Sequence, residues 1–296
     1  MKLLITGGTG FIGTALCEKL LNNGNNELTL LTRSPEKIKT QVKVISNLIQ
    51  LDKDTSFDVI INLAGEPIAD RRWTENQKQK ITKSRIDITE QIIAFIKTAD
   101  HKPELLINGS AIGYYGINKT NEDIDENATG DNSFSSKLCK QWENTALQAN
   151  SFGVRTCLLR TGIVLGKNGG VLSKMLPPFK MGLGGKIGSG QQWMPWIHID
   201  DLVGIILYCI EHDDLTGAIN GTSPNPVTNN VFTKTLGKVL NRPTFMAIPE
   251  TIITLLMGQM GVELLLSGKK IIPVKITEKG YRFQYPGLEN ALQNIL

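Results

Sequence analysis

The sequence has few of the side chains that bind metals or form disulfides. It contains three histidines and four cysteines, and no two cysteines form a CxxC pair. Metal sites need several such ligands at close spacing and disulfide scaffolds need paired cysteines, so we expect neither. Isolated thiols among apolar residues are typical of reduced, buried cysteines in a cytoplasmic protein. The cysteines are Cys17, Cys139, Cys157 and Cys209.

Long apolar runs and a strong net charge are missing as well. The longest apolar stretch, Ile252 to Leu266, contains Gln259 and Glu263 and is too short to span a membrane. The first apolar run ends in glycines, unlike a secretory signal. The net charge is +4, and the densest basic stretch, Lys78 to Arg85, has the spacing of a solvated helix face. We therefore expect a cytoplasmic protein with no membrane and no nucleic-acid partner.

The N-terminus contains a glycine-rich turn between a strand and a helix. An apolar run, Leu3 to Ile5, is followed by four glycines and then by a helical pattern over Phe11 to Asn23. Glycines at this spacing let a strand turn sharply into a helix whose free N–H groups face a pyrophosphate. Because a strand and a helix flank the glycines, the pattern predicts dinucleotide binding through Gly7, Gly10 and Gly13.

Strand and helix patterns alternate along the first half of the chain. Strand patterns cover Glu27 to Thr32, Val42 to Ile45 (weakly), Asp58 to Leu63, Glu104 to Asn108 and Val154 to Arg160, and helical patterns cover Glu75 to Thr98 and Lys137 to Ala149. Such alternation predicts right-handed βαβ crossovers and a parallel sheet that binds ligands at the carboxyl ends of its strands. The expected fold class is α/β, a Rossmann doubly wound parallel sheet with a smaller, mostly helical C-terminal substrate lobe.

The second half of the chain is richer in glycine and proline. We expect an NADP-binding Rossmann domain over residues 1–165, which segments near 198–225 rejoin, and a substrate lobe over 166–296 that includes a small C-terminal domain, 241–296. Gly182 to Gly190 is predicted to be a flexible lid or substrate loop. Asp200 and Asp201 precede an apolar helical pattern, so one of them is expected to be its N-cap.

The end of the second predicted strand indicates which dinucleotide is bound. Folds that prefer NAD place a carboxylate there for the ribose hydroxyls, whereas this strand runs into Arg33 and Ser34. An arginine fork and a hydroxyl suit a 2′-phosphate, and Lys37 and Lys39 add positive charge nearby. The alternative is that Arg33 is a solvent-exposed loop residue. The sequence therefore predicts NADP rather than NAD.

Several segments resemble the short-chain dehydrogenase/reductase superfamily in its extended form. Thr6 to Gly13 is similar to the extended cofactor motif, which adds Thr9, Phe11 and Ile12 to the implied cofactor contacts. Asn62-Leu63-Ala64-Gly65 resembles the superfamily's Asn-Ala-Gly segment, which supports the sheet and lines the cofactor.

Further segments are similar to an atypical, NAD(P)-dependent epimerase/dehydratase-like subgroup of nucleoside-diphosphate-sugar epimerase family proteins. They are Gly65 to Ala69, Arg72 to Thr74, Ser84 to Ile86, Ser110 to Gly116, Trp142-Glu143, Arg160 to Gly166, Trp196 to Asp201 and the stretch from Asn241 to Glu289, which resembles a small C-terminal domain of unassigned function. The resemblance covers nearly the whole chain and implies cofactor contacts from Arg85, Arg160 and Gly162.

The superfamily's catalytic pair is a tyrosine and a lysine one helical turn apart, in which the cation stabilises the phenolate. Lys137 matches the lysine, but Ser133 stands at the tyrosine position, and a serine hydroxyl has too high a pKa to replace a phenol. Tyr115 is then the expected proton donor or acceptor. Ser110 is expected to orient a substrate oxygen, or Ala111 if the register shifts by one. For Lys137, contact with the nicotinamide ribose and an exposed position are both open.

Candidate substrate residues follow the same strand ends. Arg71 and Arg72 are adjacent guanidiniums that suit an anionic ligand, and a charge cluster at a helix start is the alternative. Trp193 is expected to cap the pocket, Trp196 to be core and His198 to be structural. Tyr114 is open between core and site. The predicted substrate residues are Glu66, Arg72, Trp73, Tyr114 and Trp193.

These features predict an NADP(H)-binding oxidoreductase or epimerase acting on a small substrate, anionic or sugar-like. The missing tyrosine supports another class, a dinucleotide-binding sensor or interaction protein without turnover. The Tyr115 hydroxyl separates the two, because catalysis needs it within reach of the substrate, whereas an inward-packed hydroxyl favours the sensor. A homodimer is compatible with the sequence.

Overall fold

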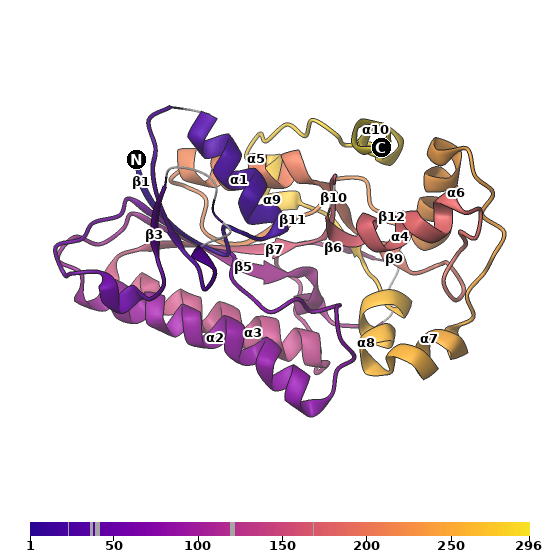
Figure 1. Ribbon diagram of the computed structural model, residues 1–296, viewed down its shortest axis with the longest axis horizontal. Helices are drawn as coiled ribbons and strands as arrows, with labels where there is room; N and C mark the ends of the chain where they lie inside the picture. The colour runs from indigo at the N-terminus through magenta and orange to yellow at the C-terminus, as the bar shows by residue number, and fades with distance from the viewer. Residues whose placement is uncertain (23, 36–37, 39–41, 119–121, 168) are drawn as a thin grey trace.

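The computed structural model describes residues 1–22, 24–35, 38, 42–118, 122–167 and 169–296. Within these residues a seven-stranded parallel sheet has the order β11-β7-β5-β4-β1-β2-β3 (Figure 1). Its strands are β1 (Lys2–Thr6), β2 (Glu27–Leu31), β3 (Lys43–Ile45), β4 (Val59–Asn62), β5 (Leu105–Ala111), β7 (Arg155–Thr161) and β11 (Gly217–Gly221). The chain runs outward from β1 to β3 and then returns to β4 on the other side. The strand order therefore reverses between β1 and β4, and the predicted Rossmann sheet is confirmed.

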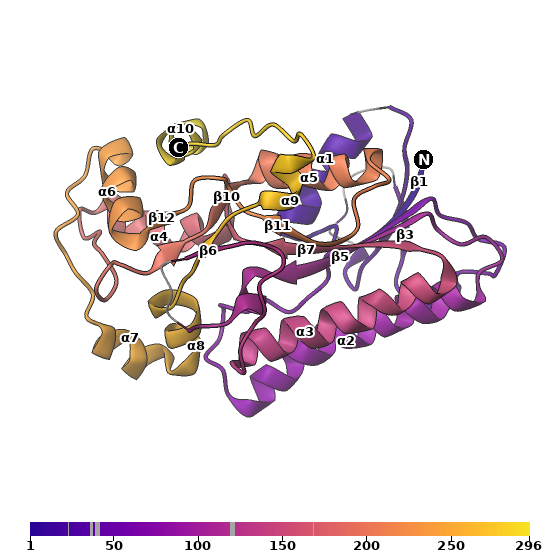
Figure 2. The ribbon, with the colours of Figure 1, turned by 180° about the vertical axis from the view of Figure 1, so that it is seen from behind.

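Helices cover both faces of this sheet, as its apolar strands require. On one face α1 (Phe11–Asn22) and α5 (Ile199–Glu211) pack over Leu3 and Ile5. On the other face α2 (Glu75–Thr98) and α3 (Phe134–Ala146) lie parallel to each other over Leu4 and Ile60 (Figure 2). Because side chains alternate along a strand, neighbouring residues of β1 enter different cores.

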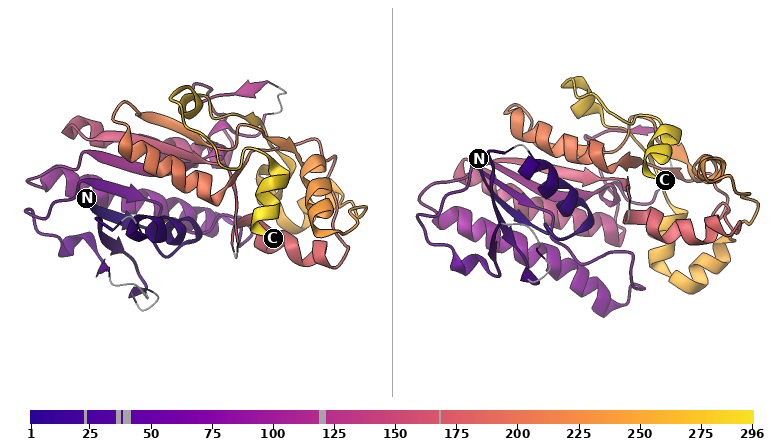
Figure 3. Two further views of the ribbon diagram at one scale, coloured as in Figure 1. Left: turned by 90° about the horizontal axis from the view of Figure 1, so that it is seen from above. Right: turned by 45° about the horizontal axis from the view of Figure 1, so that its top comes forward.

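The smaller lobe lies beyond the carboxyl ends of the strands and is mostly helical (Figure 3). Its helices are α4 (Gly170–Lys180), α6 (Asn229–Leu240), α7 (Glu250–Met257), α8 (Gln259–Gly261) and α10 (Leu288–Ile295). The short helix α9 (Val274–Glu278) lies over the sheet instead, where Ile276 joins the core that α1 and α5 cover. Three short strand pairs tie it to the sheet and to itself: β6 (Asp123–Ile124) with β13 (Lys270–Ile271), β8 (Ile163–Leu165) with β10 (Trp196–His198), and β9 (Trp193–Met194) with β12 (Val227–Thr228). Short helical turns are η2 (Leu48–Gln50), η3 (Ile112–Tyr115), η4 (Leu147–Phe152) and the π-helix η5 (Val262–Leu266).

Three local expectations were wrong. The N-cap of α5 is His198, whose ring accepts a hydrogen bond from the N–H of Asp200, because the helix begins one residue before the aspartates. Helix α3 begins at Phe134 rather than at Lys137. The glycines of 182–190 do not form a free lid, since a Cβ on Gly185 would lie 1.4 Å from the carbonyl oxygen of Met246. There they allow close backbone packing against residues 246–248.

Other expectations for single residues were confirmed. The four cysteines are free and buried. Trp196 is fully buried, and its indole donates a hydrogen bond to the carbonyl of Asn225. Among the described helices, none has the length and apolarity to cross a membrane.

Candidate functional site

The turn between β1 and α1 is too tightly packed to accept side chains at Gly7 and Gly13. Gly7 has a φ of 72°, in the left-handed region, and its carbonyl accepts a 2.9 Å hydrogen bond from the N–H of Gly10. A Cβ on Gly13 would lie 2.2 Å from the Gly7 carbonyl oxygen, and one on Gly7 would lie 2.6 Å from that of Leu63. The start of α1 therefore lies against the end of β4, and the first N–H groups of such a helix are available to an anion.

The other residues of the turn have different surroundings. The Phe11 ring would lie 2.8 Å from a Cβ on Gly166, so it packs on the segment that leads to α4. Ile12 is half-buried against the core, whereas Thr9 and Gly10 are exposed. Thr9 and Gly10 are thus the open positions of the turn.

At the end of β2 the structure places Arg33 on the surface and Ser34 half-buried. The backbone N–H of Ser34 donates to the hydroxyl of Thr32 over 3.1 Å, which shapes the turn after the strand. Lys37 and Lys39 lie outside the described residues. An exposed arginine beside a glycine turn is available to a ligand phosphate and equally to solvent.

Asn62 ties the strand ends together beneath the glycine turn. Its side chain accepts a hydrogen bond from Thr6 (2.6 Å) and donates to Thr89 (2.9 Å) and Asn108 (2.7 Å). Because Asn62 is fully buried, this amide supports the sheet from inside. Leu63 and Ala64, which follow it, are half-buried at the strand end.

Arg85 shapes the loop after β4. Its guanidinium donates to the carbonyls of Glu66 and Ile81, both over 3.1 Å, and a Cβ on Gly65 would lie 2.9 Å from its Cζ atom. The N–H of Glu66 donates to the hydroxyl of Ser84, which lies on α2 next to Arg85. Arg85 therefore holds this loop against α2, and glycine at position 65 is required for the close approach.

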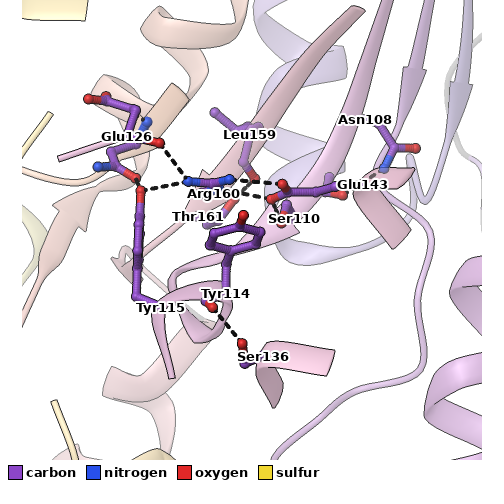
Figure 4. A network of polar contacts seen from close by, with 12 residues as sticks. Asn108, Ser110, Tyr114, Tyr115, Glu126, Ser136, Glu143, Leu159, Arg160 and Thr161 are labelled. Carbon is purple, nitrogen blue, oxygen red and sulfur yellow. Dashed lines mark hydrogen bonds and ion pairs between the residues drawn. The ribbon is translucent and has the colours of Figure 1, made fainter. Parts of the chain in front are cut away.

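A buried ion pair lies directly beneath the end of β5 (Figure 4). Arg160 binds the two carboxylate oxygens of Glu143 through Nε and Nη2, each over 2.9 Å, and both side chains are 5% exposed. The Ser110 hydroxyl donates to the same carboxylate over 2.6 Å. Ser110 and Arg160 therefore bind protein groups in this structure rather than facing the turn.

The two adjacent tyrosines both contact the Arg160 end of this ion pair. The Tyr115 hydroxyl is fully buried, donates to Asn220 (2.6 Å) and accepts from Arg160 (3.0 Å). Burial raises the pKa of Tyr115 to about 12, and the Arg160 cation offsets only part of that shift. The Tyr114 ring lies 3.4 Å from the Arg160 guanidinium and is half-buried. Tyr115 is thus packed inward, and Tyr114 is the more exposed of the pair.

The face of α3 that meets the sheet carries different residues from those expected. Ser135, Cys139 and Glu143, spaced four apart, are buried against η3 and β5, whereas Lys137 is exposed. A Cβ on Gly113 would lie 3.0 Å from that of Ser135 and 3.9 Å from the Cys139 sulfur. Burial raises the pKa of the Cys139 thiol to about 11. In the sequence, Ser135, Cys139 and Glu143 recur every four residues beside the apolar Leu138 and Trp142, and this spacing is the signal that could have found this face.

The predicted substrate residues are spread over the loop 65–74 and the lobe. The Trp73 indole donates to the carbonyl of Ile68, and its ring packs edge-on against Phe134, so this side chain is part of a small core. Arg72 is exposed and lies against Gly258 of the lobe. Lys174 of α4 reaches across to Asp70 over 2.5 Å. The loop is thereby linked to both α4 and the α7–α8 junction.

The remaining predicted residues mark where backbone segments meet. Gly162 donates to the carbonyl of Gly221, and a Cβ on it would lie 2.5 Å from the carbonyl oxygen of Pro195. Trp193 is half-buried beneath the ammonium of Lys270 at 5.5 Å. Glu66 is half-buried in the loop after β4. These contacts bring β7, the lobe and the C-terminal segment together at one edge of the sheet.

Two charged residues of the C-terminal segment bind the start of α3 and the end of η3, which the sequence did not suggest. Glu263 accepts hydrogen bonds from the N–H groups of Phe134 (3.2 Å) and Ser135 (3.0 Å) and from the Ser135 hydroxyl (2.6 Å). The buried Lys269 ammonium donates to the carbonyl of Tyr115. A cavity of about 540 Å³ beside Glu263 is lined by residues 117–118, 131–133, 259 and 262–263.

Among the described residues, no three His, Cys, Asp or Glu side chains lie close enough together to hold a metal ion. His198 is buried and stacks on Tyr285 with ring centroids 4.0 Å apart. Burial lowers its pKa, in keeping with a packed, neutral ring.

This chain resembles known proteins in both sequence and fold. The model of the NAD dependent epimerase/dehydratase family matches residues 3–220, and that of a domain of unknown function, DUF1731, matches residues 248–295. The chain is 38% identical to the epimerase family protein SDR39U1 homolog of Arabidopsis thaliana, over all of this chain and 87% of that protein. It is 36% identical to human SDR39U1, whose crystal structure with NADPH superposes with a TM-score of 0.90 over 100% of this chain and 99% of that one. A UDP-glucuronic acid 4-epimerase from Bacillus cereus in complex with NAD shares the fold (TM-score 0.78, 99% and 94% covered) at 18% identity.

Proposed function

Because this chain belongs to the NAD dependent epimerase/dehydratase family, we propose that it binds NADP(H) and uses it as an oxidoreductase on a small substrate, anionic or sugar-like. The observation that carries the proposal is the glycine turn at the start of α1, beside a strand end with Arg33 and Ser34 and no carboxylate. The crystal structure of the human relative with NADPH supports the choice of dinucleotide.

The residues present fit this group. A Cβ at Gly7 or Gly13 would clash with the carbonyl oxygen of Leu63 or of Gly7, so glycine at these positions lets β1 turn tightly into α1, whose first backbone N–H groups would hold the pyrophosphate. Arg33 and Ser34 would hold the 2′-phosphate. When bound, the nicotinamide supplies or accepts a hydride. The residues of the chain would bind and orient the dinucleotide, and Arg85 would contribute by holding the loop after β4 in place.

None of the side chains expected to transfer a proton during turnover is free to do so in this structure or lies at the expected place. Tyr115, proposed as acid or base, is fully buried with a raised pKa, and Lys137 is exposed on the outer face of α3. The Ser110 hydroxyl is held by Glu143. These three catalytic roles therefore stay predictions. The inward Tyr115 hydroxyl specifically favours a second candidate, a protein that binds NADP(H) and responds to it without turnover.

Titration with NADPH and NADH, followed by nicotinamide fluorescence, tests the binding proposal. We expect NADPH to bind more tightly than NADH, and Arg33→Ala to weaken NADPH binding by about 10- to 100-fold because a charge-assisted contact is lost. NADH binding should not change. Arg282→Ala, which removes an exposed arginine outside the site, is the matched control. Equal affinity for the two dinucleotides would contradict the proposal.

The two candidates separate in a turnover assay. Oxidation of bound NADPH by a panel of sugar and carboxylate carbonyl compounds would support the oxidoreductase. Tight NADPH binding without oxidation by any of them would favour the sensor. Tyr115→Phe should leave any turnover intact if the buried hydroxyl is structural.

A further inference from the structure

A second cavity lies between α2 and α3, next to the one beside Glu263. Its volume is about 490 Å³, which is within the range of small-molecule sites. Its walls are one face of α2 over residues 75–83, the start of α3, and Gln259 of α8. Figures 1 and 2 both show α8 at this end of the two helices. We call this space the lysine cavity, after the residues that give it its charge.

Three of its lining residues are lysines and one is a glutamate, which leaves a net charge of +2. The Lys78 ammonium binds the Glu75 carboxylate over 2.9 Å and lies 5.6 Å from the centre of the Phe134 ring. Lys83 and Lys137 are exposed, and neither forms an ion pair with another described residue. Two of the three ammonium groups are therefore free to bind an anion.

The packing of α2 against α3 brings these lysines to one place. The α2 residues that line the cavity recur at intervals of three and four, which puts them on one face of the helix. Lys80 belongs to the same basic stretch of the sequence but does not line the cavity. The stretch from residue 78 to 85 was expected to be a solvated helix face, and the structure makes part of that face the wall of a cavity.

The cavity beside Glu263 has the opposite charge. Its described lining residues include two carboxylates, those of Asp131 and Glu263, and no cation. The two cavities meet at Asn132 and Gln259, which line both. An anion near this end of α2 and α3 is therefore attracted to the lysine cavity and repelled by its neighbour.

We propose that the lysine cavity binds the phosphate group of a small phosphorylated ligand through Lys83 and Lys137. A phosphate monoester carries about −1.5 to −2 charges at pH 7, which matches the charge of the walls. Lysine ammonium groups bind phosphate as point charges. The side-chain amides of Gln79 and Asn132 have no hydrogen-bond partner among the described residues and can donate to further phosphate oxygens.

The lysine cavity is separate from the proposed dinucleotide site. Helices α2 and α3 cover the face of the sheet opposite to α1, whose start forms the glycine turn. The proposal goes beyond the proposed function and does not rest on it, so either can fail while the other stands.

Titration of the full chain with inorganic phosphate at constant ionic strength tests the proposal, with amide NMR signals as the readout. We expect saturable changes at residues 78–83 and 134–137. The dissociation constant should be on the order of millimolar, because exposed charges are screened. Sodium chloride at the same ionic strength should leave these signals unchanged. Saturating NADPH should leave the constant unchanged as well, because the glycine turn lies across the sheet.

Glucose 6-phosphate is the second probe and separates two sources of the phosphate group. Tighter binding than that of inorganic phosphate would assign the cavity to an organic phosphate, since its volume exceeds what one phosphate fills. Equal affinity would assign it to free phosphate. In both cases the same signals should respond.

The matched variants exchange single lysines of α2 and α3. Lys83→Gln and Lys137→Gln should each weaken phosphate binding about three- to fivefold, because each removes one exposed charge contact. Lys80→Gln is the control and should bind as the wild type does. All three side chains are exposed, and circular dichroism verifies that the variants fold. Several results overturn the proposal: no saturable binding of either probe, an equal response to sodium chloride, competition by NADPH, or equal losses in Lys80→Gln and Lys83→Gln.

Discussion

Two adjacent tyrosines show how a single residue is assigned to the core or to the site. Tyr114 stacks on Arg160 and is half-buried, whereas the Tyr115 hydroxyl lies between Asn220 and Arg160 with no exposure. A buried phenol bonded to both a donor and an acceptor is held neutral, because its phenolate would lose hydration. Tyr115 therefore holds η3 to β7 and β11 and is poorly suited to exchange protons near neutral pH.

This placement predicts a specific alkaline instability. The pKa of Tyr115 rises from 10.0 to about 12 on folding, so its contribution to stability is present below pH 10 and is lost as the pH rises through about 12. Two pKa units correspond to roughly 2–3 kcal/mol. Tyr115→Phe should cost about 1–3 kcal/mol at neutral pH, since Asn220 and Arg160 lose a partner, and should flatten the fall above pH 10.

Urea unfolding over this pH range measures both effects. Tyr114→Phe is the control, because it removes a hydroxyl from the neighbouring residue and should keep the wild-type dependence of stability on pH. An unchanged alkaline slope in Tyr115→Phe would show that this hydroxyl is not the group that titrates.

Helix α3 is the element whose register matters most for the site. The expected tyrosine–lysine pair led to Ser133 and Lys137, but the helix begins at Phe134 and turns Ser135, Cys139 and Glu143 toward the sheet. Its first two N–H groups, those of Phe134 and Ser135, donate to the Glu263 carboxylate. Glu263 lies 128 residues after Ser135 in the chain. The start of this helix is therefore fixed by the C-terminal segment as well as by its own sequence.

Removal of that carboxylate should loosen the start of α3. Glu263→Ala leaves the Phe134 and Ser135 amides and a buried hydroxyl without an acceptor, at an expected cost of about 1–3 kcal/mol. Amide exchange should speed up at these residues. Glu263→Gln, which keeps an acceptor oxygen, should recover part of the loss.

An exposed glutamate in the same segment provides the comparison. Glu289, whose side chain is 41% exposed and pairs with Lys238, should lose no more than about 1 kcal/mol when changed to alanine. Equal effects of the two alanine variants would mean that Glu263 does not anchor α3.

The molecule as a whole is joined by contacts that cross its two lobes. Strand β13 pairs with β6, the Glu126 carboxylate accepts from the N–H groups of Asn220 and Lys275, and Ile276 belongs to the core under the sheet. The Asp201 carboxylate accepts from the N–H groups of Gln284 and Tyr285, which fixes the return of the chain to α10. The C-terminal segment thus completes the core on one face of the sheet and ties the two lobes together.

We therefore expect the described fold to unfold in one cooperative step. Far-ultraviolet circular dichroism and tryptophan fluorescence should give coincident urea transitions. NADPH at about 100 times its dissociation constant should raise the free energy of unfolding by about 2.7 kcal/mol in both transitions, since it binds only the folded chain. An earlier fluorescence transition, with NADPH shifting only the later one, would show that the C-terminal segment unfolds separately.

The sequence alone determined the sheet, the glycine turn and the choice of dinucleotide proposed here, because each depends on residues close together in the chain. The strand at Leu3 to Ile5 and the glycines at 7 and 13 specify a strand, a turn and a helix through local geometry. Helix α2 was predicted with its observed ends, since Thr74 caps it and its apolar period is regular.

Only the tertiary structure decided which polar groups face inward. Tyr115 finds Asn220 and Arg160, Glu263 finds the start of α3, and His198 rather than an aspartate caps α5. A polar side chain is buried where another segment supplies its hydrogen-bond partner, and such partners lie as much as 154 residues away, as for Lys269 and Tyr115. Because no local pattern contains that partner, the sequence predicted where a candidate site lies but did not determine which of its polar side chains are buried against other segments.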